Sequence, residues 1–208
     1  MSNEFFTDWS VRFTKLLIQD FKLSPLDCHA ILGNAGAESN GFKSLQEIKP
    51  LVKGSAGGYG IMQWTGPRRR LYESYCSRNG LKPSDMMSNY KFLFVELNGD
   101  EGKGGQVLAR VKTARTLEAK TEVFMKEFLR PGIPHLDGRI RWAKIAQTAW
   151  GDLDRVDQGG VTTGNGTSVR PIEDPKPVEP QTPSSNRKPQ SLVDILIQVL
   201  KVLFGGRS

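Results

Sequence analysis

One carboxyl group, that of Glu38, follows a helix-like segment whose side chains are mostly small. The run GNAGAESNGF, residues 33–42, has two glycines and two alanines before this acid and then breaks at Asn40-Gly41. A carboxyl near a helix C-terminus faces the negative end of the helix dipole, which disfavours ionisation, and partial burial acts in the same direction. An acid that keeps its proton near neutral pH is suited to general-acid cleavage of a glycosidic bond. Glu38 is therefore the candidate catalytic acid.

Gly33 and Gly36 lie just before this acid, and each costs roughly 1 kcal/mol in a helix relative to alanine. Glycines at a helix crossing would explain them, and so would a ligand that approaches the helix closely. Considered with the aromatic segment that follows in the sequence, the second interpretation is favoured. We expect a bulky polymer to lie against this part of the helix.

The segment GGYGIMQW, residues 57–64, is the second candidate for binding chemistry. The rings of Tyr59 and Trp64 are of a kind that stacks on sugar faces, and the Gln63 amide offers a donor and an acceptor together, which suits an N-acetyl group. Many hairpins contain an aromatic and glycine-rich loop, so the segment alone is weak. Together with an acid 25 residues before Gln63, it indicates a glycan site.

A second carboxyl group is required by most glycosidases, which use one as acid and the other as base or nucleophile. Glu47 is the nearest downstream acid that could direct a water molecule, and Glu73 is a poorer candidate within a predicted helix. Surface charge is the favoured explanation for both, and Glu96 is interpreted as an ion-pair partner within the fold. A lone Glu38 fits either hydrolysis or attack by the sugar's own 6-hydroxyl group.

Helical periodicity dominates residues 1–150, which carry the core-forming patterns. Ser24, Pro25 and Asp27 supply an N-cap, a proline at the first helical position and an acid at the third, so a helix is predicted from here to Asn40-Gly41. The other predicted helices run from Thr7 or Asp8 to Phe21 and over 68–78, 84–97, 106–114, 116–130 and 139–150.

Between residues 43 and 66 the helical periodicity fails, and the glycines there predict a loop or a short hairpin near 55–65. The predicted fold class is therefore mainly α (α+β): a helical domain with one small β or loop element that forms one side of a glycan cleft.

The composition changes after this domain. Residues 151–190 are rich in Pro, Gly, Ser and Thr and predict an extended linker. Residues 191–208 predict an amphipathic helix, because ten of the thirteen residues from Leu192 to Phe204 are apolar. Thirteen helical residues reach about 20 Å, short of the ~30 Å hydrocarbon core of a bilayer. We expect the helix to lie in a membrane interface, to dock on a partner or virion protein, or to self-associate; folding back onto its own domain is the alternative.

The overall composition describes a soluble globular protein with a polar extra segment: 38% of residues are hydrophobic and 25% charged. The formal charge of +7 favours binding to polyanions, without choosing among nucleic acid, an anionic membrane and an acidic wall polymer. Two cysteines, Cys28 and Cys76, and two histidines are too few and too scattered for a structural zinc site, so no metal and no cofactor are expected. Two free thiols are favoured over a disulfide.

These motifs have a family resemblance. AILGNAGAESNGF (30–42) followed by GGYGIMQWTGPRRRLYESY (57–75) resembles the phage tail lysozyme family, within the broad lysozyme-like superfamily that also holds goose-type lysozymes and lytic transglycosylases. The resemblance continues through FLFVEL, VLARVKTARTLEAKTEVFMKEFLRPG and RIRWAKIA, and so covers roughly residues 26–148. One departure is Asn40, which stands before Gly41-Phe42 where the superfamily often has Glu-Ser-Gly-Phe-Asn-Pro.

The resemblance implies a lysozyme-like domain over residues 1–150 that binds peptidoglycan glycan strands. Glu38 would be the catalytic acid, Ser39 would help to orient it, and the residues that bind substrate beside Ser39 would be Tyr59, Gly60, Met62, Gln63 and Trp64. The implied activity is that of a muramidase, which cuts the β-1,4 bond between N-acetylmuramic acid and N-acetylglucosamine. The alternatives are a lytic transglycosylase with 1,6-anhydro products and a non-catalytic wall-binding or virion protein. No nucleic-acid partner is expected.

The first residues, MSNEFFTDWS, show no basic n-region and no apolar stretch of signal-peptide length. We therefore expect either a phage virion component that opens the wall during entry, or an endolysin made in the host cytoplasm and released to the periplasm and cell wall.

Overall fold

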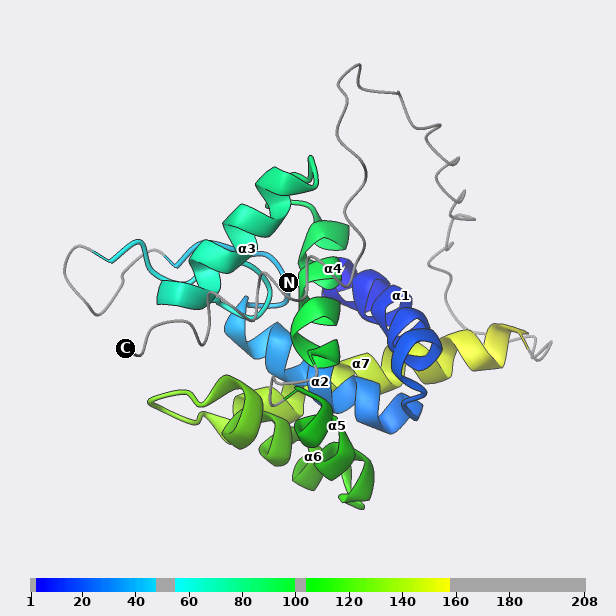
Figure 1. Ribbon diagram of the computed structural model, residues 1–208. Helices are drawn as coiled ribbons and strands as arrows, with labels where there is room; N and C mark the ends of the chain where they lie inside the picture. The colour runs from blue at the N-terminus through cyan, green and yellow to red at the C-terminus, as the bar shows by residue number, and fades with distance from the viewer. Residues whose placement is uncertain (1–2, 48–54, 100–103, 158–208) are drawn as a thin grey trace. The chain divides into compact units, whose positions relative to one another are not determined.

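The computed structural model describes residues 3–47, 55–99 and 104–157 of the 208-residue chain. These residues form seven α-helices and one π-helical turn, and no regular strand occurs among them (Figure 1). The elements in chain order are α1 Glu4–Phe21, α2 Pro25–Glu38, α3 Gly66–Arg78, α4 Met86–Asn98, α5 Gly104–Thr113, α6 Leu117–Phe124, η1 Met125–Leu129 and α7 Leu136–Asp157. The predicted, mainly helical fold is confirmed.

Helix α2 begins as the sequence predicts. The Ser24 hydroxyl accepts a hydrogen bond from the Asp27 backbone N–H at 3.2 Å, and the Asp27 carboxylate accepts one from the Ser24 N–H at 2.9 Å. This reciprocal pair is a capping box, with Pro25 at the first helical position. The helix ends at Glu38, so the candidate acid is its last residue.

Other helix boundaries differ from the prediction. Helix α1 begins at Glu4 rather than near Thr7, whose hydroxyl instead donates to the Glu4 carbonyl from within the first turn. The predicted helix over 116–130 is two elements, because a π-helical turn follows α6 and ends at Arg130, which has a left-handed φ of 53°. Helix α7 extends beyond both predicted ends, 139 and 150.

Helix α2 is the central helix of the domain. It packs against α1 and α6, and each of its residues from Asp27 to Gly36 is buried. A Cβ added at Gly33 would lie 2.4 Å from the Cβ and 2.7 Å from the Cα of Ala143 in α7. The two helices therefore touch backbone to backbone at this point.

This packing corrects the expectation that the glycines of α2 make room for a polymer. Gly36 is covered as Gly33 is, since a Cβ there would lie 2.7 Å from the Phe6 ring and 3.1 Å from the Trp142 side chain. The close approach that excludes larger residues is made by the domain's own helices. The alternative interpretation, a helix crossing, is the correct one.

A buried ion pair joins the start of α2 to α6. Lys120 Nζ lies 2.6 Å from Asp27 Oδ1 and also donates to the Val111 carbonyl at 2.8 Å. Burial opposes ionisation of Asp27, but the hydrogen bonds from Lys120 and Ser24 outweigh it and hold the pKa of Asp27 below its ordinary value. The pair therefore connects the capping box of α2 to α6, which carries Lys120, and to Val111 of α5.

His29 is buried in α2 next to this pair, and neither of its ring nitrogens has a hydrogen-bond partner among the described residues. Burial lowers the pKa of His29 to about 4. A histidine in the unfolded chain takes up its proton near pH 6.5, so the unfolded state binds more protons below that pH and the folded state loses stability. We expect a loss of about 2 kcal/mol on going from pH 7 to pH 5.

Thermal or urea unfolding of the wild type and His29→Phe between pH 7 and pH 4 measures this effect. The slope should be reduced in His29→Phe and kept in His135→Gln, which changes an exposed histidine. Equal slopes in the wild type and His29→Phe would show that His29 is not the group that titrates.

The two cysteines are buried and unpaired, as the sequence favours. Burial raises the pKa of the Cys28 thiol to about 12, so this thiol stays protonated and unreactive at neutral pH. Within the described residues no helix is both long and apolar enough to cross a bilayer. The predicted linker over 151–190 lies outside the described residues from 158 onward, and the predicted helix over 191–208 lies wholly outside them.

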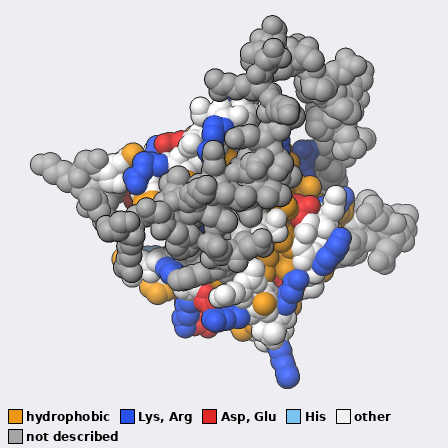
Figure 2. Space-filling model, in the orientation of Figure 1, with side chains coloured by type: hydrophobic (Ala, Val, Ile, Leu, Met, Phe, Trp, Pro, Cys, Tyr) orange, Lys and Arg blue, Asp and Glu red, His pale blue; other side chains and the backbone are white. Residues whose placement is uncertain are grey.

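Lysine and arginine side chains are prominent on the surface over α5 and α6 in the view of Figure 2. A hollow of about 270 Å³ lies there, lined by Gln106, Val107, Arg110, Lys126, Glu127 and Arg130. Glu127 pairs with Arg110 at 2.9 Å and Glu122 with Lys126 at 2.5 Å, so much of this positive charge is compensated locally.

Candidate active site

Glu38 forms an ion pair with an arginine that the sequence analysis did not single out. Arg139 Nη2, from α7, lies 2.8 Å from Glu38 Oε1. The Arg139 side chain is only 5% exposed, whereas that of Glu38 is 20% exposed. The carboxyl group is thus held from the protein interior and remains accessible from outside.

Arg139 uses its other nitrogens to bind α2 at a second point and the turn that precedes α7. Its Nε donates to the Pro134 carbonyl at 2.8 Å, and its Nη1 donates to Asn34 Oδ1 at 3.3 Å. The Asn34 amide in turn donates to the carbonyls of Ala30 in α2 and Thr121 in α6, both at 3.0 Å. One guanidinium therefore joins α2, α7 and the turn that precedes α7.

A sequence signal for Arg139 existed. Arg139, Ala143 and Ala146 are spaced at i, i+4 and i+7 on α7, and all three are buried. An arginine in the apolar stripe of a helix requires an acceptor, because a buried guanidinium is costly without one. The spacing alone could not identify Glu38 as that acceptor.

The turn after Glu38 is built by Ser39. The Ser39 side chain is fully buried; its hydroxyl donates to the Ala35 carbonyl at 2.7 Å and accepts from the Phe42 N–H at 3.2 Å. Asn40 has a left-handed φ of 49°, followed by Gly41 at 66° and Phe42 at 66°. Asn40, the departure from the superfamily pattern, thus begins a left-handed turn that buries Phe42 beside the Phe6 ring, 4.8 Å between ring centroids.

Residues 45–47 and 55–64, the described parts of this segment, contain a small antiparallel element but no regular strand. Tyr59 and Trp64 exchange backbone hydrogen bonds of 3.0 and 2.8 Å, and isolated bridges join Tyr59 to Gln46 and to Trp64. Gly60, whose φ is 81°, has the ring of Trp64 where a Cβ would be, 2.4 Å away. The structure therefore has a tight loop over 59–64 where the sequence predicts a loop or short hairpin.

The predicted sugar-binding residues differ in their exposure. Trp64 and Met62 are buried, and the Trp64 Nε1–H donates to Glu96 Oε2 at 2.6 Å. Gly60 is buried as well, while Tyr59 and Gln63 are half-buried. The Trp64 ring was expected to stack on a sugar. It is instead enclosed in the core, where it packs against Gly60 of the loop.

The side chains of Gln63 and Tyr59 also make contacts within the domain: Gln63 forms hydrogen bonds, and the Tyr59 ring lies under Arg69. The Gln63 amide donates to the Ser44, Leu45 and Gly60 carbonyls at 3.2, 3.1 and 3.0 Å. These bonds occupy the donors that the sequence analysis assigned to an N-acetyl group.

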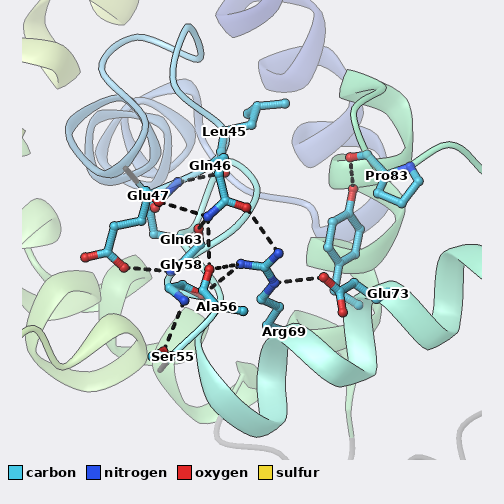
Figure 3. A network of polar contacts seen from close by, with 12 residues as sticks. Leu45, Gln46, Glu47, Ser55, Ala56, Gly58, Gln63, Arg69, Glu73 and Pro83 are labelled. Carbon is cyan, nitrogen blue, oxygen red and sulfur yellow. Dashed lines mark hydrogen bonds and ion pairs between the residues drawn. The ribbon is translucent and has the colours of Figure 1, made fainter. Parts of the chain in front are cut away.

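Arg69 of α3 holds this loop in place through several contacts, as Figure 3 shows. It pairs with Glu73 at 2.7 Å, donates to the Gly57 carbonyl at 3.1 Å and to Gln46 Oε1 at 3.1 Å, and lies over the Tyr59 ring at 5.1 Å. The sequence predicts a helix over 68–78, and no pattern within it distinguished Arg69.

Each of the other carboxyl groups considered has a structural partner. Glu47 Oε2 accepts a hydrogen bond from the Gly58 N–H at 2.7 Å, and Glu73 pairs with Arg69. Glu96 binds Arg68 through both oxygens, at 2.8 and 2.9 Å. The interpretation of Glu96 as an ion-pair partner is confirmed; Glu47 as a second catalytic carboxyl stays a prediction.

Comparison with known proteins adds an independent finding. The chain matches the phage tail lysozyme family over residues 11–149, about two-thirds of its length. A search of the curated proteins gives no match. The matched range contains Glu38, Arg139 and the 57–64 loop, and it supports a lysozyme-type, peptidoglycan-degrading function. On this match the chain belongs to the phage tail lysozyme family.

Proposed function

We propose that the protein is a muramidase in which Glu38 is the proton donor, acting on the β-1,4 bond between N-acetylmuramic acid and N-acetylglucosamine. The observation that carries the proposal is the position of Glu38 within the family match. It ends a helix buried from Asp27 to Gly36, yet its own side chain is 20% exposed and faces a buried cation.

In the proposed reaction Glu38 gives its proton to the glycosidic oxygen, and the bond between that oxygen and C1 of the muramic acid breaks. Positive charge develops at C1 and the ring oxygen, and a new bond to C1 then forms from a water oxygen or from the 6-hydroxyl of the same sugar. Glu38 becomes a carboxylate in this step, 2.8 Å from the Arg139 guanidinium. As the new bond to C1 forms, the attacking oxygen gives its proton to a carboxylate: to Glu47 in hydrolysis with two carboxyls, or back to Glu38 when Glu38 acts alone. The chemistry requires no cofactor.

Hydrolysis and transglycosylation place different demands on the other carboxyl groups. Hydrolysis with two carboxyls would use Glu47 to direct water, and this requires Glu47 to leave the Gly58 N–H or to act with its second oxygen. Transglycosylation needs Glu38 alone. Lytic transglycosylation therefore remains the alternative to the muramidase reaction.

Mass spectrometry of the muropeptides released from purified sacculi tests the proposal. A muramidase gives reducing muramic acid ends, whereas a lytic transglycosylase gives 1,6-anhydro ends that are lighter by one water. We expect reducing ends. Anhydro ends would replace hydrolysis by transglycosylation, and the absence of any soluble product would favour the non-catalytic alternative, a wall-binding or virion protein.

Two settings fit a phage peptidoglycan-cleaving enzyme. In the virion it would open the wall during entry, and as an endolysin it would act from the host cytoplasm at release. The formal charge of +7 favours adsorption to an anionic wall in both. The predicted 191–208 helix would attach it to a virion protein or a membrane. Detection of the chain in washed virions would exclude a purely endolytic role.

A further inference from the structure

We propose that Arg139 is the positioning residue of this site: it fixes the Glu38 carboxyl group in its reactive orientation and stabilises the carboxylate that remains after proton transfer. The inference rests on the proposed role of Glu38. It assigns a function to Arg139 of α7, which lies 101 positions after Glu38 in the sequence.

The geometry of the guanidinium supports this role. It binds three acceptors, two on α2 and one in the turn before α7: Glu38 Oε1 at 2.8 Å, Asn34 Oδ1 at 3.3 Å and the Pro134 carbonyl at 2.8 Å. A fork of fixed geometry with three anchors leaves the bound oxygen little freedom. Arg139 thereby fixes the position of Glu38 Oε1.

The burial of the arginine supports it as well. Arg139 is 5% exposed, so solvent screens its interaction with Glu38 less than it would screen a surface pair. Arg141 and Lys144, the neighbouring cations on α7, are exposed. Arg139 is thus a buried cation paired with Glu38, and it stabilises the carboxylate that proton transfer leaves there.

The position of Arg139 on α7 ties it to the contact between α7 and α2. Arg139 shares the buried stripe of α7 with Ala143, whose backbone touches Gly33 of α2. Helices α2 and α7 therefore touch at two places that are one turn of α7 apart. The Gly33–Ala143 contact sets the distance between the helices, and the Glu38–Arg139 ion pair forms at that distance. A longer distance between the helices would move the guanidinium away from the carboxyl.

The test compares Arg139→Met, Arg139→Lys and the control Arg141→Met, which removes an exposed arginine two residues away on the same helix. For each variant, kcat and KM on soluble glycan fragments are measured, with circular dichroism and Tm as checks of folding. We expect kcat of Arg139→Met to fall about 100-fold with KM changed little, because the acid is misplaced. Arg141→Met should keep the wild-type kcat and KM.

Arg139→Lys keeps a charge and most of the volume, so it should fold and have a kcat between those of Arg139→Met and the wild type. If Arg139→Met does not fold, the Lys variant carries the test. A folded variant at position 139 with the wild-type kcat would overturn the proposal. An inactive wild type would instead contradict the proposed function, before Arg139 is considered.

Discussion

Glu38→Gln is expected to lower peptidoglycan cleavage by about 100- to 10,000-fold, the contribution typical of a positioned general acid. The substitution keeps the length and volume of the side chain but removes the proton that the glycosidic oxygen must receive. The glutamine oxygen can still accept a hydrogen bond from Arg139 Nη2, which lies 2.8 Å from Glu38 Oε1 in the wild type. Release of soluble muropeptides from sacculi, with kcat and KM on glycan fragments, measures the effect.

Loss of half of a buried ion pair also lowers stability, so Tm and sacculus binding must be measured on the same preparation. Glu122→Gln is the matched control, because it makes the same chemical change in an exposed pair with Lys126. The control should keep both activity and Tm. A folded Glu38→Gln that retains activity within tenfold of the wild type would remove Glu38 as the proton donor.

The sequence is a good guide to the fold where local interactions decide the structure. The capping box of Ser24 and Asp27 and the left-handed turn at Asn40-Gly41 involve residues within a few positions of one another, and both ends of α2 are where the sequence predicts them. The division of 116–130 into α6 and a π-helical turn depends on tertiary packing, for which the sequence carries no periodic signal.

The candidate site is less predictable because its contacts are distant in sequence. Glu38 is recognisable from the small residues before it, although the reason inferred for Gly33 and Gly36 is wrong: they face Ala143, Phe6 and Trp142 rather than a ligand. Arg139 reaches Glu38 only through the crossing of α2 and α7. No spacing rule within one segment could show that contact.

The aromatic segment over residues 57–64 shows a second case in which the sequence identifies a residue but not its surroundings. A tryptophan beside glycines is compatible with sugar stacking and with a core position, and the choice depends on what packs behind the loop. Tyr72 and Phe92, from α3 and α4, lie 4.6 and 5.0 Å from the Trp64 ring, centroid to centroid, and enclose it. The type of residue was informative, whereas its exposure depended on how α3 and α4 pack around it.

The second large effect is expected at the buried Asp27–Lys120 pair, where Lys120→Met should lower the free energy of unfolding by about 3–5 kcal/mol. Lys120 and Asp27 side chains are 6% and 5% exposed, so the carboxylate left behind would lose its cation in a site that water barely reaches. The capping box would keep Asp27 in place without neutralising it. Urea unfolding at pH 7 measures the loss, which corresponds to a fall in Tm of roughly 10 °C.

The pH dependence of this effect has a definite sign. Because the pKa of Asp27 is lowered in the folded protein from an ordinary value of 3.8, the pair stabilises the fold above about pH 4, and this stability is lost as the pH falls through the folded value. Wild type and Lys120→Met should therefore differ less in stability at pH 2–3 than at pH 7. A difference that does not change with pH would indicate lost packing of the lysine chain rather than lost charge pairing.

Two further variants separate the pair from its surroundings. Asp27→Asn with Lys120→Met removes both charges while the amide can still cap Ser24, so the double variant should be more stable than Lys120→Met alone. Lys126→Met removes a lysine from an exposed pair in which Lys126 and Glu122 are 63% and 41% exposed, and it should cost less than about 1 kcal/mol. If Lys120→Met also costs less than that, the pair does not hold α2 against α6, and the stability of the central helix must come from its apolar contacts and its cap.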